Sequence, residues 1–149
     1  MQTYTVEDLK ARVGQVLGES GPHQITQEQV NEFADATGDH QWLHVDVEKA
    51  KQGPYHGTVA HGFLTVSLLP MMLDETASIT GVKAMVNYGL NKLRFPAPVP
   101  VGSTIRGTLT LNALAEAHGG LELDLGFDIR VEGAEKPSAV GESVFLLFT

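Results

Sequence analysis

An aspartate and two histidines stand close together directly after a glycine, in the stretch TGDHQWLH at residues 37–44. Asp39, His40 and His44 are residue types that transfer protons or bind metals. His40 and His44 have the spacing of the helical His-Glu-x-x-His zinc motif, but Gln41 stands where that motif needs its glutamate. We therefore predict that no metal binds here. Two alternatives remain, a proton-transfer pair formed by Asp39 and His44, or a turn followed by a core histidine.

A second pattern of interest is the pair His61 and Gly62, which stands at the beginning of an apolar run that ends near residue 73. The first N–H groups of a helix have no partner inside it and carry partial positive charge, and a glycine lets a ligand approach the backbone closely. Such a site suits a carbonyl oxygen that gains negative charge during a reaction. This second pattern favours the proton-transfer interpretation. We expect His61 to have a capping or structural role rather than to donate a hydrogen bond near the mouth of the helix.

The elements that position these residues follow from local patterns. A short helix is predicted over residues 5–12 and a strand over 13–18. Thr26 opens a longer helix through a capping box with the glutamine three residues later, and Gly38 is a natural residue to end it. An irregular segment is then expected from 39 to 61.

The run at 61–73 has almost no polar face, which predicts a helix buried on all sides. Pro70 is expected to bend this helix or to mark the end of its first turns, and Gly81 is expected to close it. Beyond residue 83 apolar and polar residues alternate, which is typical of antiparallel strands, with a hairpin turn at 118–120. A helix followed by a meander of about four strands indicates an α+β fold in which a curved sheet wraps the helix.

The chain has 149 residues, which suggests a single domain over 1–149. A net charge of -8 and a pI of about 5.1 argue against nucleic acid and anionic membranes as partners. The chain has no cysteine, which excludes thiolate chemistry and disulfides. We find no signal-peptide core, and the apolar run is too short to span a bilayer, so a cytoplasmic location is expected.

The two patterns together resemble one known family. The segments FADATGDHQWLHVDVEKA and GPYHGTVAHGFLTVSLLP are similar to those of the MaoC-like dehydratases, also called (R)-specific enoyl-CoA hydratases. The branch that includes nodulation protein N and bacterial 3-hydroxyacyl-thioester dehydratases is the most similar. The resemblance covers about residues 13–149, and many members have Asn-Pro where this chain has Gln41 and Trp42. The matching positions are Asp39, Leu43, His44, Asp46, His61 and Gly62.

This resemblance implies a hot-dog fold, in which a long central helix is wrapped by an antiparallel sheet, and a homodimer. It implies reversible syn hydration of a trans-2-enoyl thioester to an (R)-3-hydroxyacyl thioester. Asp39 and His44 would hold the water and move its protons, and the N–H of Gly62 would stabilise the thioester oxygen. No cofactor is implied, because coenzyme A or an acyl-carrier protein enters as part of the thioester substrate.

Further residues are candidates for substrate contact, each with a structural alternative. Ser67 matches a serine of the family near the catalytic pair, but its hydroxyl could equally bond to the preceding helical turn. Trp42 and Tyr55 are candidates for the acyl pocket or for the core. Lys92 and Arg94 are candidates for binding the coenzyme A phosphates or are solvated strand charges. His61 completes the set of candidate contacts.

Two other functions are compatible with a hot-dog fold. A thioesterase would use a carboxylate to direct water at the thioester carbonyl, and a non-catalytic module would only bind acyl-CoA. The intact pair of Asp39 and His44, followed by the His-Gly pattern, favours the hydratase over both.

Overall fold

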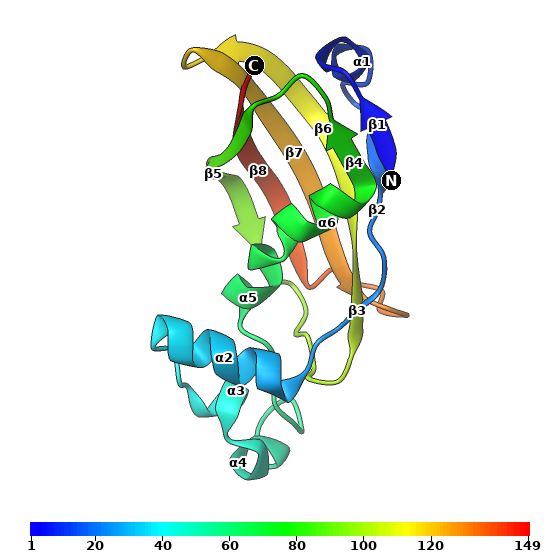
Figure 1. Cartoon of the computed structure of the whole chain (residues 1–149). Coiled ribbons are helices and arrows are strands. Elements are labelled where there is room, and N and C mark those ends of the chain that lie inside the picture. Colours follow the sequence, from blue (N-terminus) through cyan, green and yellow to red (C-terminus); the bar gives the residue numbers. More distant parts are fainter.

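A computed structural model covers residues 1–149, and Figure 1 shows how its helices and strands are arranged. In chain order they are β1 (Gln2–Tyr4), α1 (Val6–Lys10), β2 (Val16–Glu19), β3 (His23–Gln24), α2 (Gln27–Thr37), α3 (Trp42–Val45), α4 (Val47–Lys51), α5 (Gly62–Ser67), α6 (Leu69–Thr76), β4 (Ala77–Ile79), β5 (Ala84–Arg94), β6 (Thr104–Ala117), β7 (Gly120–Val131) and β8 (Ala139–Phe148).

The main sheet is antiparallel, with the strand order β2-β6-β7-β8-β5 and with β3 also paired to β6. The predicted hairpin is confirmed. His118 and Gly119 have φ angles of 53° and 76°, as a two-residue type I′ turn requires. The predicted meander holds only for β6, β7 and β8, because β5 crosses to the far edge and pairs with β8.

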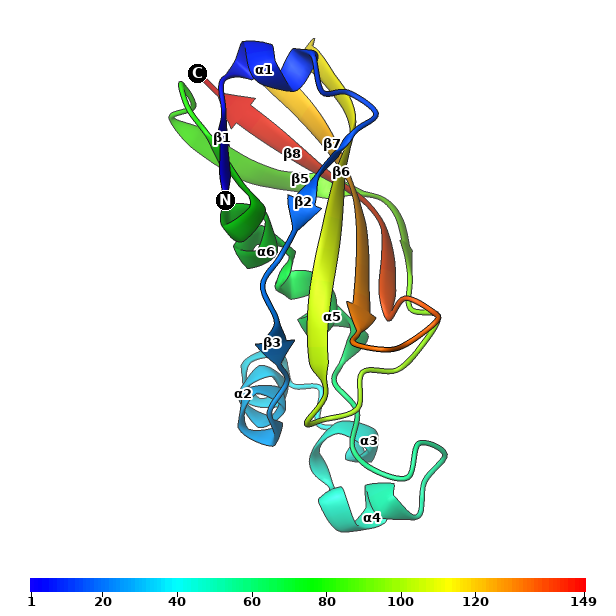
Figure 2. The same ribbon diagram turned by 90° about the vertical axis from the view of Figure 1, so that its right-hand side faces the viewer.

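The central helix lies across one face of this sheet, as Figures 1 and 2 show, and the family's expected α+β arrangement is confirmed. It is divided at Leu68 into α5 and α6, just before Pro70, which has no N–H to continue the helical ladder. The expected burial on all sides is wrong. Leu64 and Met72 face the core, but the side chain of Phe63 is 65% exposed, because the sheet covers only one side of the helix.

The amino-terminal segment is close to its prediction. Thr5 and Asp8 form a capping box at the start of α1, and the strand predicted at 13–18 is observed as β2. Gly81 does not close the central helix, which already ends at Thr76. There the chain becomes β4, which pairs in parallel with β1 and leaves no residues for a longer helix.

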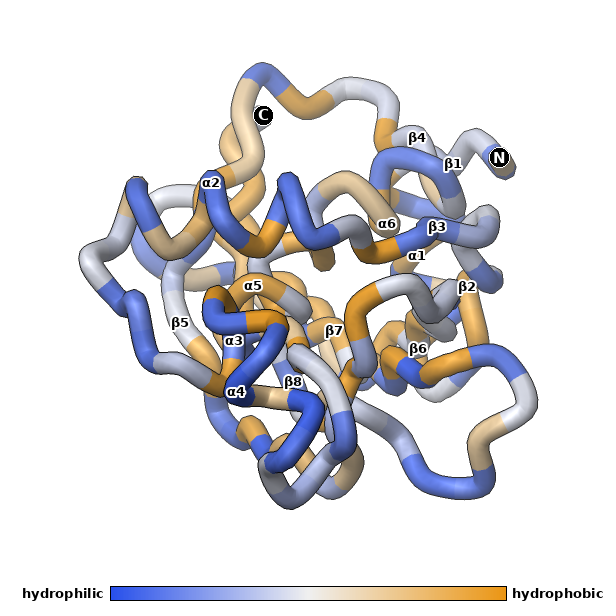
Figure 3. The backbone as a smooth tube through the Cα atoms, turned by 90° about the horizontal axis from the view of Figure 1, so that it is seen from below, coloured by the Kyte–Doolittle hydropathy of each residue, from blue (hydrophilic) through white to orange (hydrophobic).

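Three short helices lie at one end of the sheet, and Figure 3 shows their polar outer turns from that end. Helix α2 ends at Gly38, whose φ of 82° lies in the left-handed region as predicted. The expectation of an irregular segment from 39 to 61 is wrong in part, because α3 and α4 form within it. The carboxylate of Asp46 accepts a hydrogen bond from the N–H of Lys49, which caps α4.

One carboxyl group on β7 is placed unfavourably and gives a stability prediction. Oδ1 of Asp124 is buried without a hydrogen-bond partner, and burial, followed by repulsion from Glu142 and Glu122, raises the pKa of Asp124. A raised carboxyl pKa means that ionisation destabilises the fold as pH rises, so the penalty is present at pH 7 and is relieved in acid. Asp124→Asn should therefore raise the melting temperature at pH 7 by about 2–4 °C.

Thermal melts at pH 7 and pH 4 check this, because the gain should shrink near the ordinary carboxyl pKa of 3.8. Asp128→Asn is the matched control on the same strand. Its carboxylate accepts hydrogen bonds from Arg130, so its loss should not stabilise the protein. An equal gain for both variants would contradict the argument.

Candidate active site

Asp39 lies in the turn that follows α2. The left-handed Gly38 reverses the chain direction, and Asp39 comes next with its side chain exposed. Its N–H donates to Oγ1 of Thr37 at 3.4 Å, and its Oδ1 accepts from the N–H of Gln41 at 3.3 Å. These hydrogen bonds are long, so local contacts alone hold the aspartate weakly.

His44 lies in the single turn of α3 and is half-buried. Its Nδ1 is 2.7 Å from the carbonyl oxygen of Val59. A carbonyl only accepts hydrogen bonds, so Nδ1 carries the proton and Nε2 of the neutral ring is free to accept one. The backbone of Val59 therefore selects the tautomer in which His44 can take a proton from a bound molecule.

His61 joins these two residues. Its ring stacks on that of His44, with centroids 3.8 Å apart and planes 24° apart, and its Nε2 lies 2.9 Å from the carbonyl oxygen of Asp39. The side chain makes no capping hydrogen bond to α5. The side chain of His61 therefore does not cap the helix, because its ring turns toward the loop that carries Asp39, and its burial fits the structural part of the expectation.

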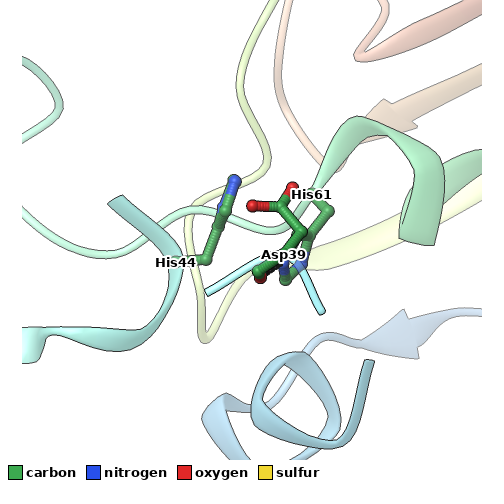
Figure 4. A group of neighbouring side chains, drawn as sticks. All are labelled: Asp39, His44 and His61. Atoms are coloured by element: carbon green, nitrogen blue, oxygen red, sulfur yellow. Dashed lines mark hydrogen bonds between the residues drawn. The ribbon is translucent and has the colours of Figure 1, made fainter. Parts of the chain in front are cut away.

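Asp39, His44 and His61 form one cluster, with one polar atom from each within 4.8 Å of the others (Figure 4). No direct hydrogen bond links the carboxylate of Asp39 to His44. Polar atoms within 4.8 Å of one another but not hydrogen-bonded suit two groups that act on one water molecule between them. The tertiary structure thus brings together residues from the end of α2, from α3 and from the start of α5.

The same cluster has the composition of a metal site, and His61 is a third possible ligand that the sequence spacing had not indicated. Its geometry is unfavourable for zinc. The lone pairs of imidazole nitrogens lie in the ring plane, and two stacked rings with centroids 3.8 Å apart and planes 24° apart do not direct them at one tetrahedral ion. Nδ1 of His44 and Nε2 of His61 are also engaged by backbone carbonyls.

We therefore expect exhaustive dialysis against EDTA to leave the activity unchanged. The measurement is the hydration rate of an enoyl thioester before and after dialysis, with metal content determined in parallel. Loss of activity that added zinc restores would revive a metal role for the cluster.

Gly62 shares a cavity of about 240 Å³ with His44 and Tyr55. As the first residue of α5, Gly62 has an N–H without an acceptor inside the helix. The ring of Phe95 covers its α-carbon, and an added Cβ would lie 2.8 Å from that ring. Phe95 also lines the cavity, and nothing in the local sequence pattern had indicated its role. Any side chain at position 62 must therefore displace the ring of Phe95.

Only one of the other candidate residues lines this cavity. Tyr55 lines the cavity, whereas Trp42 packs against Gly53 and under the ammonium group of Lys49, outside the cavity wall. Ser67 donates its hydroxyl hydrogen to the carbonyl of Phe63 and lines a separate hollow of about 440 Å³ beside β5. Ser67 therefore makes the alternative contact considered for it, a hydrogen bond from its hydroxyl to the preceding helical turn.

The two basic candidates lie on the edge strand β5. Lys92 and Arg94 are exposed, and Arg94 donates only to the carbonyl of Leu93. Neither lines the cavity with His44, so a role in binding phosphate stays a prediction.

Comparison with known proteins shows the family of this chain. The family model of the MaoC like domain matches residues 8–120. The chain is 49% identical over 146 residues to 3-hydroxyacyl-thioester dehydratase Z of Mycobacterium tuberculosis, with 97% of each chain covered. The chain belongs to the MaoC-like family. Nodulation protein N of Rhizobium leguminosarum bv. viciae is 39% identical over 134 residues, which covers 89% of this chain and 83% of that protein.

The fold of this MaoC-like protein also matches a solved structure. The (R)-hydratase from A. caviae involved in PHA biosynthesis superimposes with a TM-score of 0.75 at 26% identity, covering 91% of this chain and 96% of that one. The predictions of the hot-dog fold and of a hydro-lyase are confirmed by these relatives. None of the helices is long and apolar enough to cross a membrane.

Proposed function

We propose that this MaoC-like enzyme reversibly hydrates trans-2-enoyl thioesters to (R)-3-hydroxyacyl thioesters. The observation that carries the proposal is the position of His44, which lies in one cluster with Asp39 and lines a cavity together with Gly62. The cavity of about 240 Å³ is large enough for the reacting end of a thioester, and the carrier would extend outward. Coenzyme A or an acyl-carrier protein is the carrier, and no separate cofactor is needed.

In the proposed reaction, the oxygen of one water molecule bonds to C3 of the enoyl thioester and a proton is added to C2. Nε2 of His44, which the bond to Val59 leaves unprotonated, takes a proton from the water as its oxygen forms a bond to C3. The pair of Asp39 and His44 then delivers a proton to C2 on the same face. The double bond between C2 and C3 becomes a single bond, and the 3-hydroxyacyl product contains all the atoms of the substrate and of the water. The reverse sequence dehydrates the hydroxyacyl thioester.

The thioester carbonyl must gain negative charge while C3 accepts the water oxygen. We assign its stabilisation to the N–H of Gly62, because this donor is unpaired at the start of α5 and Gly62 lines the cavity together with His44. One preorganised donor of this kind contributes roughly 3 kcal/mol to catalysis. Phe95, which covers the glycine, limits access of water to the same position.

An assay with crotonyl-CoA tests the proposal. A hydratase removes the ultraviolet absorbance of the enoyl thioester without releasing a thiol, and chiral analysis should find the (R)-3-hydroxy product. Release of free thiol would instead identify a thioesterase. Tight binding without any chemical change would identify a non-catalytic acyl-CoA-binding module.

The exposed apolar surface of β5 supports a homodimer. Val86, Tyr88 and Leu90 are large exposed hydrophobic residues on a strand that forms the edge of the sheet. An unprotected edge of this kind invites pairing with another chain. We propose that a second copy of this chain pairs along β5 and covers the exposed Phe63 of α5.

Sedimentation velocity should accordingly detect a dimer of about twice the 16.0 kDa chain mass. Val86→Lys places a charge on the pairing edge and should shift the equilibrium to the monomer. Val13→Lys is the control, since Val13 is also exposed but lies outside the sheet. A monomeric wild-type protein would contradict this assembly.

A further inference from the structure

His61 has contacts that neither helix capping nor substrate binding explains. Its side chain is only 2% exposed and does not line the cavity that His44 and Gly62 share. The ring lies between two aromatic neighbours, His44 on one face and Phe33 at a centroid distance of 4.9 Å. A ring packed in this way has little freedom to reorient, so a hydrogen bond from it also restricts the position of its partner.

The hydrogen bond of His61 reaches the weakly held aspartate. The carbonyl of Asp39 only accepts, so Nε2 of His61 carries the proton and donates it over 2.9 Å. The segment from Val59 to His61 therefore holds both members of the pair. Its carbonyl at Val59 orients the ring of His44, and its histidine side chain fixes the backbone of Asp39.

The other ring nitrogen of His61 is left without a partner. Nδ1 is buried and makes no hydrogen bond, which destabilises the folded protein relative to an apolar side chain of similar size. If this position served only to pack beside Phe33, leucine would give a more stable protein, because it has no unpaired polar atom. What the imidazole offers and leucine lacks is the donor at Nε2, which reaches the carbonyl of Asp39.

We infer that His61 is a positioning residue, whose Nε2–H holds the backbone of Asp39 so that its carboxylate faces the ring of His44. The changes in kcat that this inference predicts rest on the proposed function. The hydrogen bond from His61 to Asp39 does not depend on the reaction. His61 acts through Asp39 and exchanges no proton with the substrate.

Replacement of His61 by leucine and by glutamine separates positioning from packing. His61→Leu removes the donor and the unpaired acceptor together, so the melting temperature should stay the same or rise. Its kcat should nevertheless fall by about tenfold to a hundredfold, with little change in KM, because a misplaced catalytic group costs rate. His61→Gln keeps an N–H at the position of Nε2 and should recover most of the lost kcat.

His40→Leu is the matched control, because His40 neighbours Asp39 but its ring pairs with the exposed Asp35. It should leave kcat unchanged. Equal losses in His61→Leu and His61→Gln would overturn the inference, since they would require the imidazole itself to react. Unchanged kcat in His61→Leu would overturn it as well.

A double-mutant cycle identifies the partner through which His61 acts. If His61 works only by placing the carboxylate of Asp39, then adding His61→Leu to Asp39→Asn should cost less than twofold in kcat. A loss that multiplies the two single effects would assign His61 a role separate from Asp39 and overturn the inference.

Nitrogen-15 NMR of the histidine rings gives a readout that does not depend on activity. Wild-type protein should show the proton on Nε2 of His61 and on Nδ1 of His44. If the wild type fails to hydrate crotonyl-CoA but shows these tautomers, the proposed function fails while the positioning contact stands. A proton on Nδ1 of His61 would overturn the contact whatever the activity.

Discussion

Asp39→Asn and His44→Ala are each expected to lower kcat for crotonyl-CoA hydration by about a hundredfold or more, the usual contribution of a general acid or base. The asparagine keeps an oxygen for the N–H of Gln41 but cannot bind a proton. The alanine removes the only ring that combines an unprotonated nitrogen with access to the cavity. Steady-state kinetics with purified variants measures both effects.

The fold should survive both substitutions. Asp39 is exposed, and His44 is half-buried in a single helical turn, so neither supports the main core. Thermal melting and circular dichroism provide the control for folding. Wild-type turnover in either variant would remove that residue from the reaction and leave the cluster as a structural turn.

The second large effect is expected at Gly62, where loss of one N–H donor should lower kcat by about a hundredfold to a thousandfold. Proline removes this donor and is favoured at the first position of a helix. His61, with φ of -59° and ψ of 138°, already has the extended conformation that a following proline requires. Proline at this position therefore tests the donor with little disturbance of the helix.

The packing of Phe95 must be separated from this effect. The sequence suggests that the helix tolerates alanine or valine at position 62, but any Cβ there meets the ring of Phe95 at 2.8 Å. Gly62→Ala alone should therefore displace that ring, which also lines the cavity, so its kcat does not isolate the N–H donor. The informative comparison uses Phe95→Ala as background, with Gly62→Ala as the control for Gly62→Pro. Equal kcat in these two double variants would place the oxyanion donor elsewhere.

Local patterns in the chain were enough to predict the features that depend on neighbouring residues. The capping box of Thr5 and Asp8, the left-handed Gly38 and the hairpin at His118 and Gly119 each depend on backbone conformations within a few residues. Such conformations follow from side-chain type, because glycine allows positive φ angles and short polar side chains form hydrogen bonds to the nearby backbone. The residue types at Asp39, His44 and Gly62 likewise indicated proton transfer beside a helix start.

Contacts between distant segments followed only from the tertiary structure. β5 lies at the far edge of the sheet because β8 offers it a partner, although β6 is nearer in sequence. The ring of Phe95 over Gly62 and the hydrogen bond from His61 to Asp39 join segments more than twenty residues apart. These contacts depend on how the sheet, the divided central helix and the α2–α4 segment pack together. No period or spacing in the chain encodes that packing, because it minimises the exposed apolar area of the whole molecule and not of any one segment.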